Sequence, residues 1–389
     1  MSVTLPAGFA ANGLASGIKI SGGLDLALVS STLGPVPAAA VFTTNRAAAA
    51  PVQVSRRHMR ASKAMIGAVV LNSGIANAAT GEAGLRTAKR AAALVAGELA
   101  LLPEAVLVCS TGVIGEDLAI GPFEDKVAEL VAGAASTAEA SELAARAIMT
   151  TDTVPKLGAV EGSGYLVGGI AKGAGMLAPN LATMLAILTT DARAEPPELD
   201  AALRDAVAGS FHELSVDGCT STNDTVIALA SGASGRTPAR GELAGALSSL
   251  CGDLARQMAL DAEGATKLVE VLVTGASDGD EARRAARQVA ESALVKCSWY
   301  GSDPNWGRIV SELGVAVDSL DLDALVISYG PITVFERGRA ACHDRHALAS
   351  YMAGGEIEVL CELGLGTARA RMLSTDLSLG YVEENMAHS

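Results

Sequence analysis

The chain has 389 residues, of which 50% are apolar and 19% are charged, and this composition excludes an intrinsically disordered protein. The formal net charge is −14 and no lysine and arginine cluster is present, so nucleic acid and anionic membranes are excluded as expected partners. The most apolar window, residues 164–189, is interrupted by Lys172, Pro179 and Asn180, and no signal-peptide pattern opens the chain. We therefore expect a cytoplasmic protein with a large core of small aliphatic side chains.

The first half of the chain alternates short apolar runs with amphipathic stretches. Residues 1–60 have the pattern of short strands joined by turns, and the helix that follows has apolar residues at helical spacing, such as Leu85, Ala88, Ala92 and Val95. Strands are predicted at 18–20, 24–29, 40–43, 68–71 and 106–109, and helices at 84–102, 122–135 and 138–149.

A strand-loop-strand unit spans residues 164–190, and the second half repeats the alternation. Helices are predicted at 198–210, 241–259 and 280–293, a polar loop at 215–225, a strand at 268–274, and a hairpin of strands 324–328 and 332–335. Residues 356–360 alternate charged and apolar side chains, as a strand with one solvated face does. The lack of regular βαβ spacing predicts an α+β fold, with sheets that are mostly covered on both faces.

The cysteines and histidines are few and dispersed. The six cysteines show no CxxC spacing and the five histidines do not cluster, which argues against a metal site and against a disulfide framework. We expect reduced, buried thiols and no metal.

The stretch 171–191 places one hydroxyl where an irregular loop meets a buried strand. Lys172 is followed by a glycine-rich bend, which Pro179 and Asn180 interrupt. An apolar run then starts at Thr183. Thr183 is either a β-branched residue that starts a strand, or a nucleophile. In the second case its hydroxyl attacks the carbonyl of Ala182, the chain is cleaved between Ala182 and Thr183, and the freed amine of Thr183 serves as its base.

Several motifs, in order along the chain, carry a family resemblance. The central motif is Lys-Gly-x-Gly-Met-x-x-Pro-Asn-x-Ala-Thr-Met-Leu at 172–185, and further similar segments lie at 8–9, 72–74, 110–112, 150–153, 220–224, 263–267, 303–308 and at Asn385. This set resembles the glutamate N-acetyltransferase (ornithine acetyltransferase) family of arginine biosynthesis. Departures such as Ile75, Ala174 and Cys219 remove no proposed catalytic group but leave altered substrate preference open.

The resemblance implies stacked β-sheets flanked by helices, the architecture shared with N-terminal-nucleophile-like aminopeptidases. It also implies self-cleavage into an alpha chain, 1–182, and a beta chain, 183–389, that assemble as an alpha2-beta2 heterotetramer. Thr183 would take acetyl from N2-acetyl-L-ornithine and pass it to L-glutamate by ping-pong kinetics. The family needs no cofactor, and the sequence leaves open whether acetyl-CoA is also a donor.

The resemblance also assigns roles to single residues. Thr111 and Gly112 match the oxyanion-hole pair, for which the alternative is a simple turn. For Lys172 the alternative is a solvated loop lysine, and for Glu263 a carboxylate at a helix end. The residues implied to bind substrate, besides Thr183, are Thr153, Lys172, Glu263, Asn385 and Ser389.

Three other readings of the chain stay open at this point. A self-processing amidohydrolase or aminopeptidase of the same fold would use water in place of glutamate. An inactive relative would remain a single chain. A paralogue in secondary metabolism would apply the same chemistry to a related acyl donor.

Overall fold

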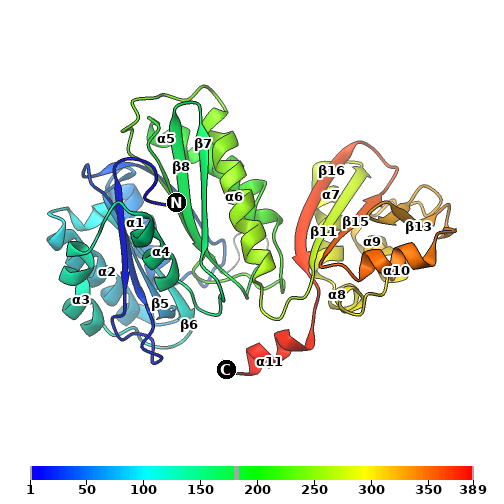
Figure 1. The fold of residues 1–389 in the computed structure, drawn as a ribbon, viewed down its shortest axis with the longest axis horizontal. Helices are drawn as coiled ribbons and strands as arrows, with labels where there is room; N and C mark the ends of the chain where they lie inside the picture. The colour runs from blue at the N-terminus through cyan, green and yellow to red at the C-terminus, as the bar shows by residue number, and fades with distance from the viewer. Residues whose placement is uncertain (1, 179–183, 388–389) are drawn as a thin grey trace. The chain divides into compact units, whose positions relative to one another are not determined.

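The computed structural model describes residues 2–178 and 184–387, and the chain forms two compact units. Unit 1 comprises Met1–His212 and Cys219–Met258, and unit 2 comprises Glu213–Gly218 and Ala259–Ser389. Their elements are labelled in Figure 1. The predicted cleavage point and the residues Ala182, Thr183 and Ser389 lie outside the described part of the chain.

Unit 1 is built on two sheets. The first has the strand order β1-β2-β5-β6, with β1 (Phe9–Leu14), β2 (Leu26–Ser31), β5 (Ala68–Ile75) and β6 (Val106–Val113). The second has the order β4-β3-β10-β9-β8-β7, with β3 (Val36–Phe42), β4 (Met65–Ile66), β7 (Lys156–Gly162), β8 (Tyr165–Lys172), β9 (Leu185–Thr190) and β10 (Thr225–Ala230). Both sheets mix parallel and antiparallel pairs, β5 with β6 and β9 with β10 being parallel.

The two sheets stack and helices cover their outer faces. Residues such as Leu28, Val70 and Val108 of the first sheet pack against α2 (Gly81–Glu98) and α3 (Gly121–Ala132). The opposite face shares one core with the second sheet and α4 (Ala138–Ala147). On the outer face of the second sheet, α5 (Pro196–Ala208) packs against β3, and Leu250 of α6 (Glu242–Leu260) lies over β7 and β8. The result is a helix–sheet–sheet–helix sandwich (Figure 1).

Two polar side chains cover the exposed edges of these sheets. Ser55 of α1 (Ala50–Ala61) accepts from the amide of Val108 and donates to its carbonyl, on the edge strand β6. Gln257 of α6 makes the same pair of hydrogen bonds with Leu157 on the edge strand β7. An edge strand has unpaired backbone groups that can pair with another chain. Each of these two side chains occupies the N–H and C=O groups of one residue on its edge strand.

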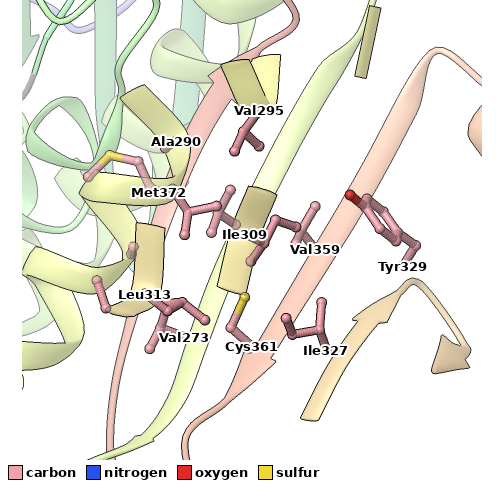
Figure 2. Packing of buried hydrophobic residues seen from close by; sticks show 14 of the residues in the cluster. Val273, Ala290, Val295, Ile309, Leu313, Ile327, Tyr329, Val359, Cys361 and Met372 are labelled. Atoms are coloured by element: carbon pink, nitrogen blue, oxygen red, sulfur yellow. The ribbon is translucent and has the colours of Figure 1, made fainter. Parts of the chain in front are cut away.

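Unit 2 contains one sheet with a helical layer on one face. Its order is β14-β13-β12-β15-β11-β16, with β11 (Leu268–Ala276), β12 (Val326–Tyr329), β13 (Ile332–Glu336), β14 (Arg339–Ala340), β15 (Glu356–Glu362) and β16 (Ala368–Thr375). Figure 2 shows residues such as Val273, Val359 and Met372 meeting Ile309 and Leu313 in the core. The helices of unit 2 are α7 (Gly279–Glu291), α8 (Ala293–Tyr300), α9 (Trp306–Ala316), α10 (Arg345–Met352) and α11 (Leu379–Ala387).

The predicted α+β class and the stacked sheets flanked by helices are confirmed. The alternation at 356–360 is also confirmed, because Glu356 and Glu358 are exposed while Ile357 and Val359 are buried. Two readings are wrong. Residues 18–20 form no strand, and residues 1–60 contain the helix α1. The six cysteines are free, as expected, but Cys219, Cys297 and Cys342 are exposed where burial was expected.

Candidate functional site

Polar residues from both sheets of unit 1 gather where four strands begin or end. In the first sheet, Thr111 and Gly112 lie at the carboxyl end of β6, opposite Ser73 and Gly74 of the parallel strand β5. In the second sheet, the last residue of β8, Lys172, lies opposite Leu185 at the start of β9. The carboxyl ends of parallel strands meet at one sheet edge, which explains why sequence-distant motifs converge here.

Gly112 occupies a position that no other residue fits. Its φ is +131°, and an added Cβ would lie 2.2 Å from the carbonyl carbon of Gly74. Thr111 is 2% exposed whereas Gly112 is exposed, so the strand passes from the core to the surface at this dipeptide. The tight pairing gives this backbone a fixed direction, as preorganised donors require. The role of Thr111 and Gly112 as an oxyanion hole stays a prediction.

Lys172 is held inside the protein by Thr150 and Asp152. Its side chain is 2% exposed, and its Nζ donates to Oγ1 of Thr150 at 2.6 Å and lies 3.6 Å from Oδ2 of Asp152. Asp152 is also bonded to Nζ of Lys156 at 2.6 Å and to the amide of Gly173 at 2.7 Å. The alternative reading of Lys172 as a solvated loop lysine is therefore wrong.

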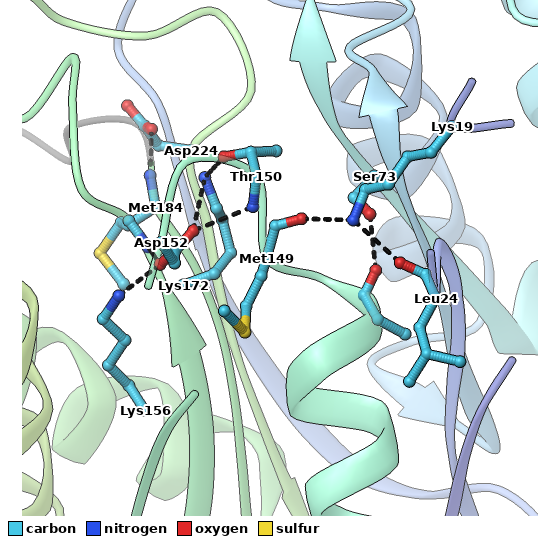
Figure 3. A network of polar contacts seen from close by, with 12 residues as sticks. Lys19, Leu24, Ser73, Met149, Thr150, Asp152, Lys156, Lys172, Met184 and Asp224 are labelled. Atoms are coloured by element: carbon cyan, nitrogen blue, oxygen red, sulfur yellow. Dashed lines mark hydrogen bonds and ion pairs between the residues drawn. The ribbon is translucent and has the colours of Figure 1, made fainter. Parts of the chain in front are cut away.

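The charge state of Asp152 follows from these partners. Burial opposes its ionised form, but the ammonium groups of Lys172 and Lys156 outweigh burial and hold the pKa of Asp152 well below its ordinary value. Figure 3 shows the carboxylate between the two lysines. Asp152 is therefore an anion at neutral pH, and it is the residue that fixes where the Lys172 ammonium lies.

Lys19 is a cation at this site that the sequence analysis missed. Its Nζ donates to the carbonyl oxygens of Leu24 and Met149, at 2.9 and 2.8 Å, and its Cγ lies 3.1 Å from where a Cβ on Gly74 would be (Figure 3). Burial lowers the pKa of Lys19, the charge of Asp25 opposes this, and the charge of Lys172 lowers the pKa further. The sequence offered no signal, because the lysine lies in a segment that was read as a strand.

Asp224 is a second buried carboxyl group, in a different state. Its Oδ1 accepts the backbone N–H of Met184 at 2.9 Å, and Ser221 also donates to this carboxyl group. Burial raises the pKa of Asp224 well above its ordinary value, and the N–H of Met184, the charge of Lys172 and the hydrogen bonds from Ser221 only partly offset this. Met184 directly follows Thr183 in the sequence, so this carboxyl group anchors the first described residue after the predicted nucleophile.

The remaining predicted substrate residues fall in different parts of the chain. Thr153 is exposed, just after Asp152 in unit 1. In unit 2, Asn385 of α11 donates from Nδ2 to Oε2 of Glu263 at 2.9 Å. The contact depends on Gly264, whose φ is +61° and where an added Cβ would lie 2.1 Å from the amide nitrogen of Tyr381. Unit 2 thus brings Glu263 and Asn385 together, while their binding of substrate stays a prediction.

Within residues 2–178 and 184–387, no group of three or more His, Cys, Asp or Glu side chains is arranged to hold a metal ion. No helix in the same residues is long and apolar enough to cross a membrane.

Comparison with known proteins gives matches over the full length of the chain. The model of the ArgJ family matches residues 10–389. The arginine biosynthesis bifunctional protein ArgJ of Mycolicibacterium paratuberculosis is 48% identical, over 100% of this chain and 96% of the relative. The protein of the same name from Thermobifida fusca is 46% identical, over 100% of both chains.

Among solved structures, the crystal structure of ornithine acetyltransferase complexed with ornithine, from Mycobacterium tuberculosis, is 41% identical to this chain. The match covers 46% of this chain and 96% of that chain, with a TM-score of 0.42. The family model matches nearly the whole sequence, and the relatives are 46% to 48% identical over the whole chain, so the family is shown. The chain belongs to the ArgJ family.

Proposed function

We propose that this protein is a glutamate N-acetyltransferase, which transfers acetyl from N2-acetyl-L-ornithine to L-glutamate in arginine biosynthesis. The observation that carries the proposal is the 48% identity, over the whole chain, to a relative named as an arginine biosynthesis bifunctional protein. The solved relative bound to ornithine supports ornithine as the leaving group. The relatives' description as bifunctional supports acetyl-CoA as a second acetyl donor.

The reaction starts with maturation of the chain. The hydroxyl of Thr183 attacks the carbonyl carbon of Ala182, the C–N bond between the two residues breaks, and the acyl group moves to the oxygen. Water then hydrolyses the ester, which leaves a carboxylate on Ala182 and a free amine on Thr183. The products are chains 1–182 and 183–389, and we propose that they assemble as an alpha2-beta2 heterotetramer in the cytoplasm.

Acetyl transfer then proceeds in two half-reactions. Oγ of Thr183 attacks the acetyl carbonyl of N-acetylornithine while its own amine takes the proton, and the proton passes to the departing amine of ornithine. Glutamate then attacks the acetyl ester through its neutral amine, and the oxygen of Thr183 regains a proton. The backbone at Thr111 and Gly112 is proposed to stabilise the oxyanion in both steps, a contribution of about 3 kcal/mol per donor in such sites.

The charge of the site favours substrates that carry a carboxylate. The lysine cluster is defined here as three lysines and the two aspartates that act on them, namely Lys19, Lys156 and Lys172 with Asp25 and Asp152. It holds one positive charge in excess, and burial strengthens its attraction for an anion. We propose that Thr153, Lys172, Glu263, Asn385 and Ser389 are substrate-binding residues of this protein.

Two measurements test the proposal. Intact-mass analysis of the purified protein is expected to show two fragments, the second starting at Thr183, whereas Thr183→Ala is expected to remain a single chain. Ornithine release from N-acetylornithine is expected to need glutamate. Equal release with and without glutamate would instead identify the amidohydrolase, and an uncleaved wild-type chain without turnover would identify an inactive relative.

A further inference from the structure

The dipeptide Asn223-Asp224 contacts both of the segments that the proposed reaction must hold together. It lies just before β10, and its two side chains are buried, with 5% of Asn223 and none of Asp224 exposed. Burying an amide and a carboxyl group side by side costs free energy unless both are used. Their partners show what each is used for.

Asn223 fixes the end of the first sheet. Its Nδ2 donates to the carbonyl oxygens of Ala76, at 2.7 Å, and Ser110, at 2.8 Å. Its Oδ1 accepts from the hydroxyl of Thr222 at 2.6 Å, so both amide hydrogens and the carbonyl oxygen are engaged and the amide has one orientation. Because Ser110 directly precedes Thr111, the side chain of Asn223 sets the position of β6 next to the proposed oxyanion-hole residues.

Asp224 fixes the start of β9 in the second sheet. Its Oδ1 accepts the amide N–H of Met184, and the amide of Thr225 donates to the carbonyl of Met184 at 3.2 Å. Met184 is held on both of its backbone polar groups by two consecutive residues. Because Met184 follows Thr183 in the chain, the segment next to the proposed nucleophile is tied to the same dipeptide as β6, the strand that carries Thr111 and Gly112.

We infer that Asn223 and Asp224 are positioning residues, which together set the separation between β6, at Ser110, and the start of the segment that leads into β9, at Met184. This inference rests on the proposed function. Neither side chain needs to touch substrate or exchange a proton. Since misplacement of reacting groups by about 1 Å costs about 100-fold in rate, a rigid link between the two strands is required.

The first test removes the donor of Asn223 without changing its shape. Asn223→Asp can donate to at most one of the two carbonyl oxygens, and only as a protonated carboxyl group, so kcat for acetyl transfer is expected to fall about 100-fold while KM for N-acetylornithine stays within about threefold. The matched control is Asn12→Asp, because Nδ2 of the buried Asn12 also donates to a carbonyl oxygen, that of Leu130, at 2.9 Å. Equal losses of kcat in the two variants would overturn the inference. If Asn223→Asp does not fold, Asn223→Ser is measured in its place with the same expectation.

The second test separates positioning from proton transfer at Asp224. Asp224→Asn keeps an acceptor for the N–H of Met184, so self-cleavage and kcat are expected to stay within about threefold of wild type, with the same pH profile over roughly pH 6 to 9. Asp224→Ala removes the acceptor and is expected to slow self-cleavage at least about tenfold. Wild-type rates in Asp224→Ala, or equal losses in both variants, would overturn the positioning role. A wild-type chain that neither cleaves nor transfers acetyl would instead refute the proposed function.

Discussion

The removal of one buried charge, by Asp152→Asn, tests how the site is held together. Asp152 and Lys156 are both fully buried, with Oδ1 and Nζ 2.6 Å apart, and Lys172 is 2% exposed. The asparagine has nearly the same shape but no charge, so both ammonium groups lose the carboxylate of Asp152 while their side chains stay buried. The backbone donors at Thr150 and Gly173 also lose a charged acceptor.

The magnitude follows from the contacts. Removing one partner of a buried ion pair costs about 3 to 5 kcal/mol, because the other charge is left uncompensated. Lys156→Met should cost less, since Asp152 then keeps Lys172 at 3.6 Å and two backbone donors. The double variant should lose less than the sum of the two single variants, because both substitutions remove the same ion pair between Asp152 and Lys156.

The assay is urea unfolding of the uncleaved Thr183→Ala chain, followed by far-ultraviolet circular dichroism and by tryptophan fluorescence. Both tryptophans, Trp299 and Trp306, belong to unit 2, whereas Asp152 belongs to unit 1, so circular dichroism is the signal that must report the loss. Equal and additive losses in the two single variants would refute the reasoning. So would an unfolding free energy of Asp152→Asn within about 1 kcal/mol of the parent chain.

Three further predictions concern single positions. Gly112→Ala should lower kcat about 100-fold or more, because the added Cβ would displace the backbone of the neighbouring strand. The control is Gly115→Ala, since Gly115 has a φ of +91° but no atom within 4 Å of an added Cβ, so that this variant carries backbone strain without a clash. Burial lowers the pKa of Lys296 to about 8, so the free energy of unfolding of the wild type should rise by up to about 3 kcal/mol relative to that of Lys296→Met as pH rises from about 8 to 10.5. Urea unfolding measures this difference, and a difference that does not change with pH would contradict the prediction. Glu263→Gln and Asn385→Ala should each raise KM for N-acetylornithine about tenfold with unchanged self-cleavage, and an unchanged KM would exclude them from the substrate site.

The sequence predicted the elements whose patterns are decided locally. The helix at Gly81–Glu98 and the strands at Ala68–Ile75 and Val106–Val113 were found because periodic or continuous apolar runs reflect burial on a regular element. The helix Ala50–Ala61 was missed for a physical reason. Pro51 lies in its first turn, where a proline is favourable, and the helix shows no acidic first turn or capping side chain that would mark its beginning.

The candidate site was predicted only where a motif carries the chemistry. Thr111, Gly112 and Lys172 were named from their motifs, and the structure places them at adjoining strand ends in unit 1. Lys19 and Asn223 were not assigned roles, because their importance comes from contacts with residues more than 100 positions away in the chain, such as Met149 and Ser110. No local pattern encodes contacts of that kind.

The pKa values of the two buried aspartates of the site are shifted in opposite directions, and this difference bears on the charge of the site. Asp152 is held ionised by two lysines, while burial favours the neutral form of Asp224 although the charge of Lys172 acts on both. The raised pKa of Asp224 favours its neutral form, which adds no negative charge to the formal excess of one positive charge in the lysine cluster. Ionisation of Asp224 would cancel that excess and place an anion next to Met184. Both proposed substrates, N-acetylornithine and glutamate, carry a carboxylate, so a neutral Asp224 is compatible with the proposed binding of an anionic group at the lysine cluster.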